Sequence, residues 1–136
     1  MARTLEQFKQ AVKLDGFQTK KKFGYAVGSG STVTQATNRA TGVTINALSG
    51  QITTNNTSLA AEASAVFTVT NSFVAATDVV LVSIASGTVA LNTDVVVTAV
   101  AAGSFSITVI NNNPAAGTAE TGAIVINFVV IKGQSS

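Results

Sequence analysis

The stretch SFSITVI, residues 104–110, is the clearest strand pattern in the sequence, because polar and apolar side chains alternate from Ser104 to Val109. Successive side chains of a β-strand point to opposite faces. We therefore expect Phe105, Ile107 and Val109 to face a core, and Ser106 and Thr108 to face solvent. The pattern predicts a half-exposed strand.

Other stretches share this short length and a content of β-branched residues, and turn residues separate them. They are Thr32–Ala36, Gly42–Ile45, Gly50–Thr54, Ala65–Thr70, Asp78–Ala85, Asp94–Ala101 and Ala123–Ile131. The first two flank a polar connection and suggest a hairpin. Asp78–Ala85 and Asp94–Ala101 begin with apolar residues on both faces, which is typical of central or interface strands. Seven or eight short strands predict an all-β fold, an antiparallel β-sandwich that is jelly-roll-like.

The composition supports β structure and excludes several kinds of chemistry. Val and Thr occur 19 times each and Ile 8 times among 136 residues, and such side chains pack well on a pleated surface. The length fits one domain. The chain has no His, Cys or Trp, which excludes an imidazole base, a thiolate nucleophile, a soft-ligand zinc site and a disulfide.

Charge divides the chain into a basic arm, residues 1–23, and a nearly neutral body, residues 24–136. Residues 1–25 carry six basic and two acidic side chains, whereas the rest of the chain carries two basic and four acidic ones. Charged residues make up 10% of the sequence, against roughly 25% in an ordinary soluble protein. A body with so little charge either relies on Ser, Thr and Asn for solvation or buries surface against copies of itself or a partner.

The arm begins with the pattern of a short helix. Thr4 and Gln7 fit a capping box, apolar residues follow at helical spacing, and Asp15-Gly16 supplies a stop. A helix of about ten residues needs a surface to receive its apolar side, either on the body or on a partner. The residues expected to contact a partner are Leu5, Phe8, Val12, Phe17, Lys20, Lys21, Lys22 and Phe23.

The sequence offers little for catalysis or cofactor binding. Asp78 and Asp94 are conceivable as a glycosidase pair, but turn-capping roles are favoured. No carboxylate cluster suits calcium, and Gly28–Thr32 lacks the Lys of a phosphate-binding loop and is interpreted as a hinge. We expect no cofactor and no metal. Asp78 and Asp94 also open two similar segments, 16 residues apart, that end at Gly87 and Gly103.

Neither a membrane nor a nucleic acid is expected as a partner. No run of roughly 20 apolar residues is present, and no apolar leader segment begins the chain, so synthesis in the cytoplasm is expected. Lys20–Lys22 and the nearby aromatic residues could touch phosphates and stack on bases, but three charges give only weak, salt-sensitive binding.

Segments across residues 24–133 resemble a family of small structural proteins of tailed bacteriophages, found as head decoration (cement) or fibre-type modules. The segments that carry the resemblance are Gly24–Gly28, Val33–Thr37, Thr41–Asn46, Ser49–Thr53, Phe67–Asn71, Ala76–Val80, Val100–Phe105 and Ile126–Gly133. The arm lies outside the shared pattern.

The resemblance implies a non-enzymatic protein of the capsid surface of a virion. Such a protein would bind the assembled head, bridge subunits of the major capsid protein and form a homo-oligomer, a trimer. Two alternatives remain open. The chain could be a fibre or receptor-binding module whose loop Asn111–Gly122 recognises a host cell-surface glycan, or a glycan hydrolase that depends on Asp78 and Asp94.

Overall fold

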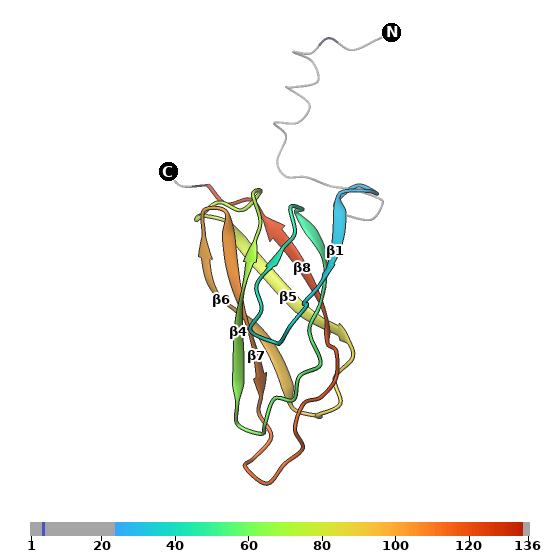
Figure 1. Ribbon diagram of the computed structural model, residues 1–136. Coiled ribbons are helices and arrows are strands. Elements are labelled where there is room, and N and C mark those ends of the chain that lie inside the picture. The colour runs from blue at the N-terminus through green and yellow to red at the C-terminus, as the bar shows by residue number, and fades with distance from the viewer. Residues whose placement is uncertain (1–3, 5–23, 135–136) are drawn as a thin grey trace.

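The computed structural model describes Thr4 and residues 24–134, and these residues form an all-β structure of eight strands (Figure 1). The strands are β1 (Gly30–Thr34), β2 (Val43–Thr44), β3 (Ser49–Thr53), β4 (Ser64–Thr70), β5 (Val79–Ser86), β6 (Thr93–Ala101), β7 (Ser104–Asn111) and β8 (Val125–Ile131). Each corresponds to a stretch predicted from the sequence. Apart from Thr4, the helix expected in the arm lies outside the described residues.

The strands form two mixed sheets of four, in the orders β1-β3-β8-β5 and β2-β4-β7-β6. The fully antiparallel arrangement expected from the sequence is wrong, because β1 pairs with β3 in parallel and β2 pairs with β4 in parallel. The predicted hairpin between the first two strands is also wrong, since β1 and β2 belong to different sheets.

Alternation of the chain between the sheets explains the parallel pairs. From β1 to β6, each strand lies in the other sheet from its predecessor, and only β6 and β7 are consecutive strands that pair. Two strands of one sheet that are separated along the chain by a single strand of the other sheet therefore run in the same direction. Within each sheet three strands share a direction, and the opposing strand, β8 or β7, takes an interior position.

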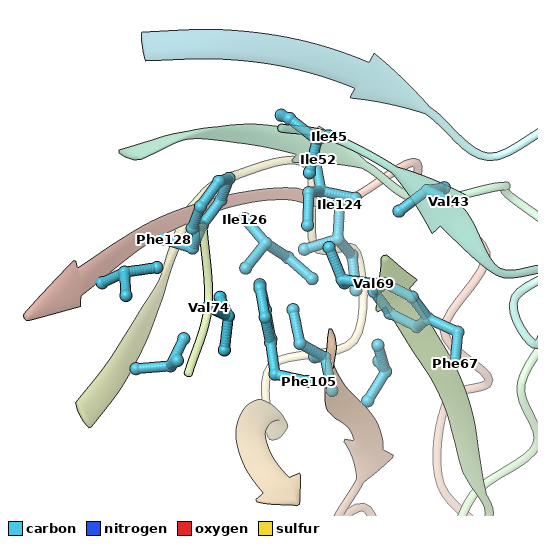
Figure 2. Close-up of a cluster of buried hydrophobic side chains, with 14 of the residues drawn as sticks. Val43, Ile45, Ile52, Phe67, Val69, Val74, Phe105, Ile124, Ile126 and Phe128 are labelled. Carbon is cyan, nitrogen blue, oxygen red and sulfur yellow. The ribbon is translucent and has the colours of Figure 1, made fainter. Parts of the chain in front are cut away.

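A hydrophobic core contains side chains from both sheets. Figure 2 shows its side chains, which come from strands of both sheets and from the connections beside them. Phe105 of β7 and Phe128 of β8 pack across the core with ring centroids 5.6 Å apart and the rings tilted by 45°. Such tilted contacts add to the free energy gained by burying the rings.

The alternation of residues 104–109 is seen in β7. Phe105, Ile107 and Val109 are almost completely buried, as predicted. Thr108, expected to face solvent, is also buried, and its hydroxyl lies 3.0 Å from that of Thr98 on the neighbouring strand β6. It is buried because β7 is an interior strand with neighbours on both sides.

The connections gather at the two ends of the strands (Figure 1). We call one end the terminal end, because the described body begins and ends there. Strands β1 and β5 begin at this end, β8 ends there, and the loop of residues 71–78 lies there. We call the opposite end the loop end. It carries the longer connections, residues 35–42, 54–63, 87–92 and 112–124. Within the described part of the chain, no helix has the length and apolar character needed to span a membrane.

Candidate functional site

The arm residues expected to contact a partner, Leu5 to Phe23, lie outside the described residues, but the structure places their point of attachment. The described body begins at Gly24, and Tyr25 donates a hydrogen bond from its hydroxyl to the carbonyl oxygen of Val130 near the end of β8. The arm therefore joins the body at the terminal end.

An ion pair fixes this terminal end. The side chain of Lys132 pairs with Asp78 and donates a hydrogen bond to the carbonyl oxygen of Phe73 at 2.8 Å. Asp78 also accepts hydrogen bonds from the backbone N–H groups of Ala75, at 2.8 Å, and Gly133, at 3.0 Å. The bond from Ala75, the bond from Lys132 and the bond from Gly133 together outweigh burial and lower the pKa of Asp78.

A buried carboxylate organises the opposite, loop end. Glu120 is fully buried, and its side chain accepts hydrogen bonds from the hydroxyl of Thr93 and from the N–H groups of Val89, Ala90 and Gly122, at 2.7 to 3.2 Å. Burial raises the pKa of this carboxyl, but the four hydrogen-bond donors outweigh burial, so the net pKa is lowered. One side chain thereby connects the loop of residues 87–92 to residues 120–122.

A buried arginine completes this network. Arg39 donates hydrogen bonds to the carbonyl oxygens of Thr57, Glu120 and Gly122, and to the hydroxyl of Thr54 at 3.2 Å. Burial lowers the pKa of Arg39, and the negative charge of Glu120 opposes this change. We call Arg39, Glu120 and their partners the buried polar network. It joins the connections of the loop end into one unit.

The Asn111–Gly122 loop, which one alternative assigns to glycan recognition, is anchored at both ends. Asn111 is completely buried and donates hydrogen bonds to the carbonyl oxygens of Leu59 and Thr118 at 3.1 and 3.0 Å. Glu120 holds the other end. Between them the tip, Pro114–Thr118, is exposed and carries only small, uncharged side chains.

The structure does not bring Asp78 and Asp94 together. Asp78 precedes β5 at the terminal end, whereas Asp94 lies near the start of β6 at the loop end and accepts a hydrogen bond from Asn112 at 2.7 Å. Strand β5 lies between them, and eight residues of strand extend over roughly 25 Å. Carboxylates of a glycosidase pair lie within about 10 Å of each other, so the pairing is wrong. Among the described residues, no three Asp, Glu, His or Cys side chains form a cluster suited to a metal ion.

The outer face of the sheet β1-β3-β8-β5 carries an exposed apolar block near the terminal end. Leu81 of β5 lies opposite Val129 of β8, and Val79 lies opposite Ile131. About half the surface of Val79, Leu81 and Ile131 is exposed. Gly24 and Tyr25 line an open hollow of about 450 Å³ together with Val129 and Ile131. We call Tyr25, Val79, Leu81, Val129 and Ile131 the apolar block.

Comparisons of the chain with known protein families, with curated proteins and with solved structures found no match. The site is therefore defined by geometry alone: an attachment point for the arm, an apolar block beside it and a fixed loop end.

Sequence reasoning missed both the buried polar network and the apolar block. A charge that stands alone in a neutral body is one available signal, because Arg39 and Lys132 are the only basic residues after residue 25. Lone charges of this kind either lie on the surface or are buried with several hydrogen-bond partners. The apolar residues on both faces of Asp78–Ala85 predict a central or interface strand, but only the sheet order shows that they leave an apolar surface exposed at an edge.

Proposed function

We propose that this chain is a structural protein of a tailed-bacteriophage virion: a decoration protein that binds the assembled head and stabilises contacts between major capsid protein subunits. In this proposal the two mixed sheets form a β-sandwich, and three copies form a homotrimer on the capsid surface. The resemblance of segments between residues 24 and 133 to phage decoration and fibre-type proteins suggests this class.

One structural observation carries the proposal: the attachment point of the basic arm and the uncharged apolar block share the terminal end of the body. A decoration protein needs a surface that recognises the capsid and a rigid body that bridges subunits. The arm can supply the first through Leu5, Phe8, Val12, Phe17, Lys20–Lys22 and Phe23. The core and the buried polar network supply rigidity.

When many copies bind a symmetric shell, weak individual contacts are sufficient for stable attachment. Symmetric, multivalent attachment multiplies the effect of each contact, so each copy needs only a few kcal/mol of binding free energy. Small uncharged side chains at the tip of the Asn111–Gly122 loop offer a glycan few hydrogen-bonding or stacking groups, which favours decoration over receptor binding.

Two measurements test the proposal. The first is the copy number of this protein per purified particle, by quantitative mass spectrometry against the major capsid protein. We expect hundreds of copies in a simple ratio. A handful of copies would assign the protein to a fibre or tail, and absence from particles would remove the virion assignment.

The second measurement separates the arm from the body. A variant lacking residues 2–23 should show the same β-sheet circular dichroism as the full chain, yet should not sediment with heads that lack the protein. The matched variant Lys20→Gln/Lys21→Gln/Lys22→Gln should bind heads with a reduced dependence on salt. Normal head binding by the truncated variant would contradict the role of the arm.

A further inference from the structure

Because β5 lies at the edge of its sheet, its apolar outer surface cannot be explained as that of a central strand. The strand is apolar on both faces over its first half, a pattern typical of central strands or of strands at an interface. The structure excludes the first explanation, since β5 is the last strand of the order β1-β3-β8-β5. Its inward Val80 belongs to the core, whereas its outward Val79 and Leu81 are 51% and 52% exposed.

The outer edge of β5 pairs with no other described strand, although β6 of the other sheet lies beside it. Exposed edge strands are commonly guarded by Lys, Pro, inward-pointing charges or bulges. Residues 79–84 contain none of these residue types, and the register shift of β5 comes only between Ile84 and Ser86. Val79 and Leu81 of the apolar block lie within these six residues.

Charge restricts what can cover this face. Of the charged residues that the structure describes, only Asp78 and Lys132 adjoin this face, next to Val79 and Ile131; the others are Arg39, Glu62, Asp94 and Glu120. The two nearest, Asp78 and Lys132, are paired with each other at the terminal end. An occupant with its own unpaired charge would therefore lose hydration without finding a partner on the face.

This charge argument disfavours the adjoining part of the arm as the occupant. Lys20, Lys21 and Lys22 lie within five residues of Tyr25. Packing that part of the arm over the apolar block would bring three ammonium groups to a surface whose nearest carboxylate, Asp78, is already paired with Lys132. A second copy of this chain instead presents an identical neutral, apolar surface.

We propose that the apolar block is the interface between copies of this chain, in a cyclic trimer whose axis runs along β5 and β8. The trimeric state rests on the proposed function. The structure supplies the surface, and we place the axis along the strands so that the three arms emerge together. A cyclic axis along the strands brings the three terminal ends together, so the three arms emerge on the same side. A two-fold axis across the strands would instead separate the arms to opposite ends.

The test compares two matched variants of the full chain by sedimentation velocity. Leu81→Asp places a carboxylate in the proposed interface, and Val66→Asp places one on an outward position of β4 in the other sheet. Leu81 and Val66 are both 52% exposed, so the two substitutions perturb the fold similarly. We expect trimers for the wild type and Val66→Asp, and a dissociation constant raised at least about 100-fold for Leu81→Asp. A monomeric wild type, or trimers of Leu81→Asp, would overturn the proposal.

A crosslinking variant gives a second readout that does not depend on a destabilising substitution. The chain has no cysteine, so Ile131→Cys creates a single thiol. Because Ile131 lies near the proposed axis at the terminal end, mild oxidation should yield disulfide-linked dimers. Thr68→Cys, on the outer face of the other sheet, should remain uncrosslinked. Equal crosslinking of both, or crosslinking of neither, would contradict the interface.

Failure of this inference is distinguishable from failure of the proposed function. Trimers that depend on Leu81 but do not associate with heads would remove the decoration role and keep the interface. If the full chain is a monomer and removal of residues 2–23 newly exposes a surface that binds an apolar dye, the arm of the same chain covers the block. That outcome would overturn the interface and leave the copy-number test of the function intact.

Discussion

Arg39 and Glu120 are joined through the backbone of Glu120: the guanidinium donates a hydrogen bond to the Glu120 carbonyl oxygen at 3.1 Å. The Glu120 side chain instead accepts from Thr93 and from the N–H groups of Val89, Ala90 and Gly122. The two buried ions therefore share Gly122, and each also holds its own segment of the loop end: Arg39 holds residues 54–57 and Glu120 holds residues 89–93. No described side chain has a buried nitrogen or oxygen without a hydrogen-bond partner.

Replacement of Glu120 should destabilise the fold more than replacement of any exposed carboxylate. In Glu120→Gln the new amide presents an NH₂ group, a donor, where four donors need an acceptor. We expect a loss of about 2–3 kcal/mol in the free energy of unfolding, measured by urea denaturation. The matched control Glu62→Gln, at an exposed position, should change it by less than about 0.5 kcal/mol. Equal losses in the free energy of unfolding for the two variants would show that the buried polar network contributes no specific stability.

Arg39 and Glu120 should be energetically coupled. Arg39→Met keeps much of the side-chain length but leaves several carbonyl oxygens of the loop end without their donor. We expect about 3 kcal/mol of destabilisation from this single change. In a double-mutant cycle with Glu120→Gln, the combined loss should fall short of the sum by at least about 0.5 kcal/mol, because both changes loosen residues 120–122. Additive losses would contradict a single network.

Stability should decrease in acid because the pKa values of Asp78 and Glu120 are both lowered in the folded state. Their unfolded-state pKa values are roughly 4. Below that pH the unfolded chain binds more protons than the folded chain, so stability that is complete above about pH 5 is lost as the pH falls through the folded pKa values. Thermal unfolding between pH 7 and pH 2 measures this. The decline should be shallower in Glu120→Gln, and an unchanged slope would remove Glu120 from the explanation.

Gly87 and Gly103 should differ in their tolerance of alanine. Both have positive φ angles, 92° and 79°, so alanine is strained at either position by about 1 kcal/mol. A Cβ atom at Gly87 would also lie 2.1 Å from the carbonyl oxygen of Ala123, whereas one at Gly103 would meet open space. We expect Gly87→Ala to lower the midpoint of thermal unfolding several-fold more than Gly103→Ala. Similar midpoints would mean that the β5–β6 connection adjusts freely.

The repeated segments that end at these glycines were recognised from the sequence, but only part of their interpretation is confirmed. Each glycine does follow a strand and takes a positive φ. Asp78 bonds to nearby backbone as expected, at Ala75. Asp94 bonds to the side chain of Asn112 instead, because its strand starts at the loop end beside that asparagine.

The eight strands and most of the inward positions can be predicted from the sequence, because side-chain alternation is a local property of each short segment. The sequence could not determine strand pairing. Hydrogen bonds between β1 and β3, or between β3 and β8, join segments far apart in the chain, and alternative pairings bury similar apolar surface.

The tertiary structure alone decided the rest. The pattern of Asp78–Ala85 fits a central strand or an interface equally well, until the sheet order places β5 at an edge. Arg39 and Glu120 are isolated charges in the sequence, and 81 positions separate them. They meet only because the chain crosses between the sheets and returns its connections to one end. The physical reason is the same in each case: burial and exposure depend on neighbours that are distant in the chain.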